Sequence, residues 1–185
     1  NVFDPTCGAG EFLLSALSLK LMINRDVHLT SESVILASLY GNDIEKTSTE
    51  ISKLRLFFFT IDSCDNNLNV IALFDSLDSH FTNKDAVDYD GVSFIGKDII
   101  IGNPPYVEYR DFQGHSRLNY GNVYADVLHY AAESLNNSGI MAFVIPLSFV
   151  ATVRMSAIRD HIQKTTNKQI VMNFADRPDS LFSSV

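Results

Sequence analysis

Apolar runs of strand length alternate with longer amphipathic stretches along the chain, and this alternation constrains the possible folds more than any other feature. It is the pattern of parallel strands joined by helical crossovers. Strands are predicted at residues 1–3, 39–42, 70–74, 98–102, 140–145 and 169–174. Helices are predicted at residues 11–22, 33–37, 46–58, 123–135 and 150–164. The sequence therefore predicts an α/β fold with a mostly parallel central sheet and helices on both faces.

Composition and length favour one globular domain over residues 1–185. The chain is 46% apolar and 19% charged, as is usual for a folded protein. No window approaches the roughly 18 consecutive apolar residues of a membrane span, and the N-terminus lacks the features of a signal peptide. We therefore expect a soluble protein without a membrane partner. The missing initiator Met indicates a piece of a longer polypeptide.

The net charge and the cysteines argue against two kinds of site. The formal charge of −8 opposes tight binding of a phosphate backbone by this chain alone, because such affinity comes from clustered Lys and Arg. Cys7 and Cys64 are far apart without metal-ligand spacing, so no metal is expected and a reducing cytosol is favoured. The acids between Asp75 and Asp90 are interpreted as a solvated loop, except for Asp75 itself.

A glycine-rich turn, "FDPTCGAGEFL", stands where the first predicted strand gives way to a helix. Gly8 and Gly10 would let a ligand approach the backbone and the helix N-terminus closely, although glycines also serve plain strand-to-helix turns. The turn is not a P-loop, since no Lys follows the glycines and Glu11 would repel a phosphate. Leu13 replaces the last glycine of a dinucleotide-binding G-x-G-x-x-G. A cofactor without phosphates fits this turn better.

Carboxylates follow two further predicted strands. Asp43 ends the second strand, where a carboxylate can accept hydrogen bonds from ribose hydroxyls. The alternative is that Asp43 caps the helix beginning near Lys46. Asp75 follows the third predicted strand and can accept a hydrogen bond from an exocyclic amine, with capping again the alternative.

The fourth predicted strand ends abruptly in "GNPPY". Prolines cannot continue a sheet ladder and they fix the backbone, so Asn103 and Tyr106 are expected at the rim of a stiff turn. A tight turn with a half-buried Tyr is the alternative. The irregular segment 109–121 comes next, and such loops at strand ends bind ligands in open α/β sheets. Its basic residues are interpreted as solvated, with phosphate contacts as the alternative: Arg110, His115 and Arg117.

In this order, "DPTCGAGEF", "GNDIE", "FDSL" and "IIIGNPPY" resemble the motifs of S-adenosylmethionine-dependent adenine-N6 DNA methyltransferases of bacterial restriction-modification systems. The resemblance spans most of the chain. It implies a Rossmann-like methyltransferase fold in a cytoplasmic bacterial enzyme, with S-adenosylmethionine lying across the strand ends. The implied reaction is methyl transfer to N6 of an adenine flipped out of double-stranded DNA.

The resemblance also implies a cofactor site. The glycine-rich turn would hold the methionine part, Asp43 the ribose and Asp75 the adenine amine, while Ile44 would pack against the adenine ring. One ligand would then explain the carboxylates after three strands. The cofactor-binding residues implied in this way are Asp4, Thr6, Gly8, Gly10, Phe12, Asp43, Ile44, Asp75 and Asn103.

By the same resemblance, N-P-P-Y is the catalytic motif. The Asn103 side-chain oxygen and the Pro104 carbonyl would accept the two N6 hydrogens and stabilise positive charge as it develops on the nitrogen. Pro104 and Pro105 would keep these acceptors in place. Tyr106 would stack on the flipped adenine. Phe182 in "DRPDSLFSSV" would close the base pocket from the other side, and a core Phe is the alternative.

Parts of the family pattern are expected to lie outside residues 1–185. They are a helix before the first motif and the target-recognition domain that reads DNA sequence. The resemblance also allows a nuclease domain or subunit in the parent protein. We expect this chain alone to bind cofactor weakly and to methylate nothing. Two alternatives stay open: an N-P-P-Y methyltransferase acting on RNA or on a protein glutamine amide, and a noncatalytic scaffold, which would not require the carboxylates and Asn103 together.

Overall fold

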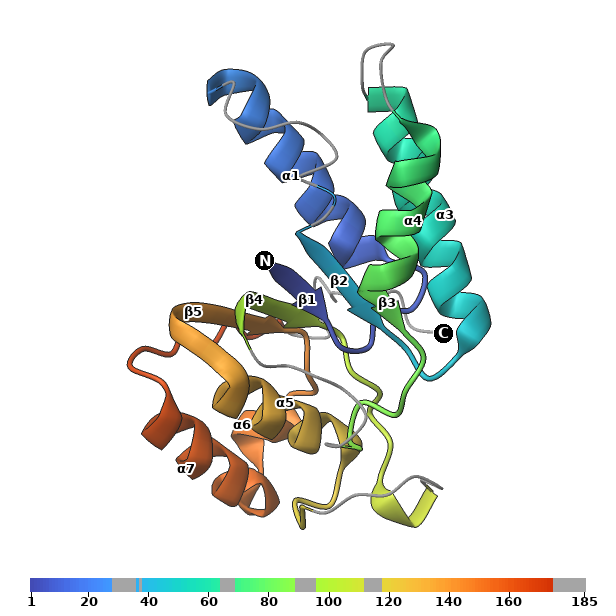
Figure 1. Cartoon of the computed structure of the whole chain (residues 1–185). Coiled ribbons are helices and arrows are strands. Elements are labelled where there is room, and N and C mark those ends of the chain that lie inside the picture. Colours follow the sequence, from blue (N-terminus) through green and yellow to red (C-terminus); the bar gives the residue numbers. More distant parts are fainter. Residues whose placement is uncertain (28–35, 37, 64–68, 89–95, 112–117, 175–185) are drawn as a thin grey trace.

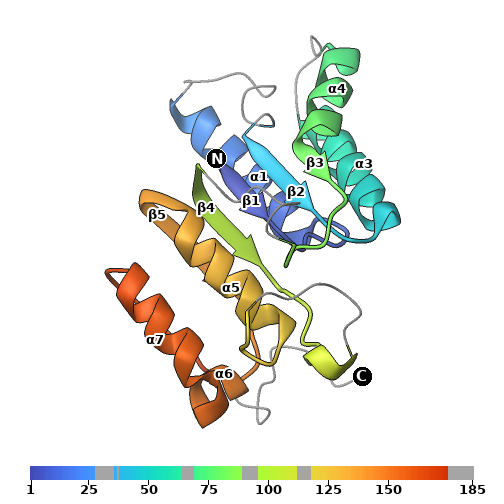
Figure 2. The same cartoon turned by 60° about the horizontal axis from the view of Figure 1, so that its bottom comes forward.

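The computed structural model describes residues 1–27, 36, 38–63, 69–88, 96–111 and 118–174. Within these ranges, parallel strands form a five-stranded sheet in the order β3-β2-β1-β4-β5 (Figure 2). The strands are β1 (Val2–Asp4), β2 (Leu39–Asn42), β3 (Phe81–Thr82), β4 (Lys97–Gly102) and β5 (Leu135–Phe143). The predicted α/β fold with a parallel central sheet is confirmed.

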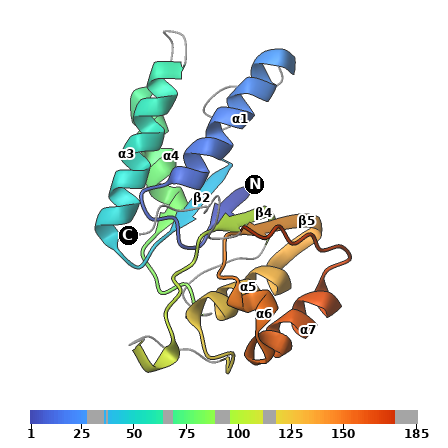
Figure 3. The same cartoon turned by 180° about the vertical axis from the view of Figure 1, so that it is seen from behind.

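Helices cover both faces of this sheet (Figures 1 and 3). One face carries α1 (Glu11–Val27), α3 (Lys46–Ser63) and α4 (Val70–His80), and the other carries α5 (Val123–Ser134), α6 (Ser148–Ala151) and α7 (Ser156–Thr165). Val2 packs into the core under α1 and α3, whereas the next residue, Phe3, packs into the core under α5, because successive strand residues point to opposite faces. Among the described residues, no helix is both long and apolar enough to cross a membrane.

The direction of chain progression reverses between β1 and β4, which are neighbours in the sheet. Val2 pairs with Leu39 of β2 on one side and with Ile99 of β4 on the other. The chain continues from β1 towards the β2 edge and from β4 towards the β5 edge, so the connections after these two strands diverge. Open α/β sheets bind ligands outside the strand ends at such a point. The glycine-rich turn and N-P-P-Y flank it.

The predicted strand at 70–74 is wrong, because these residues form the first half of α4. Asn69 caps the helix, its side chain accepting a hydrogen bond from the Ala72 N–H at 3.1 Å. Leu73 and Leu77 are buried on one helical face. A short apolar run does not by itself distinguish a buried helix from a strand. The third strand is instead β3, which follows α4 directly.

The C-terminal part differs from the prediction in three ways. Residues 169–174 form no strand with any described residue and expose large apolar side chains, so β5 is the edge of the described sheet. The helix predicted at 150–164 is interrupted by the extended backbone of Thr152, which separates α6 from a 3-10 turn (Val153–Met155) and α7. β5 begins at Leu135 because α5 leads into it without a loop. The helix predicted at 33–37 lies almost wholly outside the described residues.

Candidate functional site

The glycine-rich turn joins the end of β1 to the start of α1. Gly8 and Gly10 have φ angles of +51° and +84°, in the left-handed region that favours glycine. A Cβ atom on Gly10 would lie 2.3 Å from the Ser52 Oγ of α3, so the turn is packed closely against that helix. Phe12, in the first turn of α1, is 36% exposed. Packing against α3 therefore requires glycine at position 10, and close approach of a ligand to these glycines stays a prediction.

Asp4 places a carboxyl group inside this turn. It is only 1% exposed, and its Oδ1 accepts a hydrogen bond from the Thr6 N–H at 3.0 Å. Its Oδ2 and the Thr6 Oγ1 are both buried and have no hydrogen-bond partner among the described residues. Burial raises the pKa of Asp4 to about 7, with the Thr6 N–H lowering it and the charge of Asp43 raising it further. The turn thus contains a buried acid and a hydroxyl with unused hydrogen-bonding capacity.

Asp43 lies at the tip of β2 and holds the same turn from the other side. Its Oδ2 accepts a hydrogen bond from the Gly8 N–H at 2.8 Å, and its Oδ1 accepts one from the Glu45 N–H at 2.9 Å. Asp43 does not cap α3, because no N–H group of that helix donates a hydrogen bond to the Asp43 carboxylate. Beside it, Ile44 is 61% exposed. Asp43 and the glycine-rich turn therefore form one unit.

Asn42, which the sequence analysis missed, connects the turns after three neighbouring strands. Its side chain is fully buried and donates to the carbonyls of Pro5 at 3.0 Å and Lys84 at 2.9 Å. Its Oδ1 accepts from the Thr82 Oγ1 at 2.7 Å and from the Lys84 N–H at 3.1 Å. The only signal in the sequence is an amide at the end of an apolar strand, and its partners depend on where β3 lies.

The prediction that Asp75 follows the third strand is wrong. Asp75 lies in the middle of α4, is exposed, and precedes β3. The first acid after β3 is Asp85, which is half-buried and accepts a hydrogen bond from the Val87 N–H at 3.1 Å. Asn83, two residues earlier, donates to the Asp43 carbonyl at 3.2 Å, so this connection lies against the tip of β2. The error follows directly from the mistaken strand at 70–74.

The N-P-P-Y segment begins where β4 ends and lies next to Asp4. A Cβ atom on Gly102 would be 3.1 Å from the Asp4 Oδ1, which shows how closely the end of β4 approaches the buried acid. Asn103 is exposed, and its Oδ1 accepts a hydrogen bond from the Tyr106 hydroxyl at 2.5 Å. Pro104 is buried and Pro105 exposed. Among the described residues, none donates a hydrogen bond to the Pro104 carbonyl.

Tyr106 presents its ring at the rim of the site. The side chain is 45% exposed, and its hydroxyl lies 3.2 Å from the Val144 carbonyl at the end of β5. Its ring meets the ring of Tyr124, the second residue of α5, edge to face at 6.2 Å between centroids. Burial raises the pKa of the Tyr106 hydroxyl, which favours the neutral phenol. Tyr124 thus packs against a ring that is partly open to solvent.

The structure brings most of the predicted residues together and leaves others aside. Hydrogen bonds and close packing join the glycine-rich turn, Asp4 and Asp43, and the end of β4 adds Asn103. Asp75 is not part of this group. Burial raises the pKa of the Cys7 thiol to about 12, so it is unsuited to act as a nucleophile. Outside the described residues or side chains lie Phe182, His115, Arg117, Cys64 and the side chain of Arg110.

The parallel sheet with a glycine-rich turn after β1 and N-P-P-Y after β4 defines a Rossmann-like methyltransferase domain. A model of the Eco57I restriction-modification methylase family matches residues 37–181, and the chain belongs to this family.

Three relatives bear similar names. The chain is 27% identical over its whole length to the protein named type I restriction enzyme MpnII methylase subunit of Mycoplasma pneumoniae, and covers 33% of that protein. It is 24% identical over 94% of its length to the modification methylase CviBIII of Paramecium bursaria Chlorella virus NC1A, and covers 37% of it. Over 35% of its length it is 36% identical to a protein of Methanocaldococcus jannaschii named as a type II restriction enzyme and methyltransferase, and covers 6% of it. The chain therefore spans little more than a third of these relatives at most.

Proposed function

We propose that this chain belongs to the catalytic domain of a DNA methyltransferase that transfers a methyl group from S-adenosylmethionine to N6 of adenine, as part of a restriction-modification system. The observation that carries the proposal is the position of Asn103, Pro104 and Tyr106 at the end of β4, directly beside the glycine-rich turn at the end of β1. The names of the relatives support a restriction-modification methylase.

The residues after β1 suit a cofactor that is cationic and lacks phosphates. The unpartnered Asp4 Oδ2 can accept from an ammonium group such as that of a methionine moiety, and a bound cation would offset the cost of ionising this buried acid. The left-handed backbone at Gly8 and Gly10 keeps the turn free of side chains. When bound, S-adenosylmethionine supplies a methyl group on a positively charged sulfur.

The carboxylates after β2 and β3 suit the nucleoside part. Each carboxylate oxygen has two lone pairs, so Asp43 can accept from ribose hydroxyls while it still binds the Gly8 N–H. The exposed Ile44 offers an apolar contact for the adenine ring. The role first assigned to Asp75 falls to Asp85 in this proposal, because Asp85 is the acid that follows β3.

The target adenine meets acceptors on the N-P-P-Y segment. The lone pair of N6 is delocalised into the ring, so the nitrogen is a poor nucleophile until its hydrogens are held out of the ring plane. Asn103 Oδ1 accepts from the Tyr106 hydroxyl with one lone pair and keeps the other for an N6 hydrogen. The Pro104 carbonyl provides the second acceptor. Both stabilise the charge that develops on N6. The Tyr106 ring stacks on the flipped base, which is worth ~1–3 kcal/mol.

The test uses the full-length parent protein and its Asn103→Ala variant. Both are incubated with labelled S-adenosylmethionine and, in parallel, with DNA, RNA and protein, and the labelled product is identified by mass spectrometry. We expect N6-methyladenine in DNA from the parent and a loss of about 100-fold or more in rate from the variant, with nearly unchanged cofactor affinity. Label on RNA or protein alone, or unchanged turnover by the variant, would contradict the proposal.

A further inference from the structure

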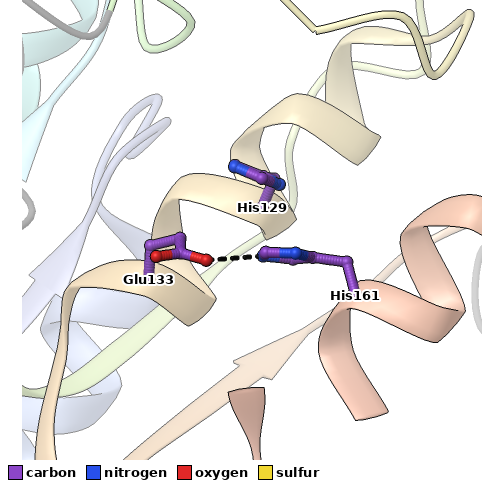
Figure 4. Close-up of side chains that lie close together, drawn as sticks. All are labelled: His129, Glu133 and His161. Carbon is purple, nitrogen blue, oxygen red and sulfur yellow. Dashed lines mark ion pairs between the residues drawn. The ribbon is translucent and has the colours of Figure 1, made fainter. Parts of the chain in front are cut away.

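A cluster of metal-ligand side chains lies between α5 and α7 (Figure 4). It shares no residue with the strand-end site, which consists of the glycine-rich turn, Asp43 and the N-P-P-Y segment. His129 and Glu133 come from successive turns of α5 and share one helical face. His161 comes from α7 and points at them across the helix contact. One ligand atom from each of the three lies within 4.8 Å of the others. Cysteine spacing gives no sign of this cluster, because its ligands are two histidines and a glutamate from two different helices.

The contacts inside the cluster leave donor atoms available. His161 Nε2 lies 3.1 Å from Glu133 Oε1, a contact that is an ion pair when the imidazole is protonated (Figure 4), and the buried Nε2 makes no hydrogen bond with any described group. The imidazole rings of His129 and His161 stack with centroids 3.9 Å apart. Two imidazoles and a carboxylate therefore converge on one place, and no hydrogen bond to a described group occupies the His161 Nε2.

The surroundings hold these side chains in place. Buried residues from both helices pack next to the cluster, among them Leu128 and Ala132 on α5 and Ile158 and Ile162 on α7. Ligands on rigid, well-packed helices keep their spacing better than ligands on loops. The exposed Glu133 keeps one side of the cluster in contact with solvent, which provides an entry path for an ion.

Tyr120 adds a contact outside the three ligands. Its hydroxyl lies 3.0 Å from the Nδ1 of His129. If Nδ1–H donates to this hydroxyl, the tautomer leaves the Nε2 lone pair of His129 free. A ring N–H donated to an outer partner is the usual arrangement for a histidine that binds a metal.

We propose that His129, Glu133 and His161 bind a divalent transition-metal ion, with Zn²⁺ the best match, and that the ion clamps α5 to α7. Two imidazole nitrogens and a carboxylate suit Zn²⁺, and the fourth position is left for water. Bonds of about 2.0–2.2 Å require the donor atoms to draw closer and the stacked rings to turn about their Cβ–Cγ bonds, because a metal lies in the plane of each imidazole. The role is structural, since none of the three residues belongs to the strand-end site.

The test is calorimetric titration of the metal-free chain with Zn²⁺, together with the visible spectrum of the Co²⁺ form and thermal unfolding with and without Zn²⁺. We expect one equivalent to bind, the spectrum of a low-coordinate Co²⁺ ion, and a higher Tm. Glu133→Gln keeps the shape of the side chain and should weaken binding by more than tenfold, as should His161→Ala. Tyr120→Phe should weaken it by about 10–100-fold without changing the stoichiometry.

His80→Ala is the matched control, because His80 is half-buried at the end of α4 and packs against the ring of Tyr40, away from the cluster. It should leave Zn²⁺ affinity unchanged. Absence of bound Zn²⁺, equal affinity in Glu133→Gln and the starting protein, or an equal loss in His80→Ala would each overturn the proposal. None of these measurements depends on methyl transfer.

Discussion

At the scale of single residues, the buried carboxyl group of Asp4 couples the stability of the strand-end site to pH. Its folded-state pKa is raised by burial to about 7 from an ordinary value of 3.8. Below the ordinary value the group is protonated in both states. As the pH rises towards 7 the unfolded chain ionises first, so the free energy of unfolding falls over this window and then levels off.

Asp4→Asn removes this dependence while it keeps an oxygen that can accept from the Thr6 N–H. We expect the free energy of unfolding of the variant, relative to that of the original protein, to be larger at pH 8 than at pH 4 by up to about 4 kcal/mol. A pKa unit corresponds to roughly 1.4 kcal/mol. Urea unfolding at the two pH values measures the gain. Parallel stability curves for the two proteins would show that Asp4 ionises normally.

Gly10 and Gly96 allow backbone strain to be separated from close packing. Both have positive φ, +84° and +78°, but a Cβ atom would overlap Ser52 only at Gly10 and would meet open space at Gly96. Gly96→Ala should cost about 1 kcal/mol through strain alone. Gly10→Ala should cost about 2 kcal/mol more, because the overlap must be relieved by moving backbone or α3. Urea unfolding of both variants checks the difference, and equal losses would contradict it.

Individual site residues could be predicted from sequence when they are close to a recognisable turn. Gly8, Gly10 and Asp43 were predicted at strand ends, where the structure has them, because their residue types and order already suggest such ends. Asn42 was not, since its four hydrogen bonds go to turns whose position depends on β3. Local sequence shows a polar residue there and does not show its partners.

At the scale of elements, the same Asn42 side chain holds the tips of β1, β2 and β3 together. Asn42→Ala would leave the carbonyls of Pro5 and Lys84 without this donor, the first in a buried and the second in a part-buried contact, and we expect a loss of about 3 kcal/mol in the free energy of unfolding. Asn136→Ala is the control, because Asn136 is exposed and bonds the exposed Asp98; it should cost well under 1 kcal/mol. Similar losses in the two variants would mean that the strand tips do not depend on Asn42.

Elements with clear boundaries were predicted well, and short apolar ones were not. β2 was predicted over the observed residues, and α1, α3 and α5 begin where expected. The run at 70–74 was assigned to a strand although Asn69 before it is a helix-capping residue, and α4 buries only Leu73 and Leu77. Helical spacing and the cap were both present in the sequence, but five apolar residues in a row fit either structure.

At the scale of the whole molecule, the sheet order brings together motifs that are distant in sequence. β1 and β4 are adjacent in the sheet, so Asp4 and Gly102 come into near contact. The alternation of strands and helices predicted a parallel sheet, whose strand ends meet at one edge, but it did not give the strand order that makes β1 and β4 neighbours. The acid that follows the third strand could not be predicted, because its identification depended on recognising residues 70–74 as part of α4.

Cofactor binding by the whole domain distinguishes the two candidate acids. If S-adenosylmethionine spans the ends of β1, β2 and β3, Asp85→Ala should weaken its binding by about 10-fold or more, since a hydrogen bond to a charged group contributes roughly 1.5–3 kcal/mol. Asp75→Ala, an exposed change in α4, should leave the affinity unchanged. Calorimetric titration of the chain, or of the parent protein if the chain binds weakly, measures both. A loss in Asp75→Ala with none in Asp85→Ala would mean that the cofactor does not lie across the end of β3.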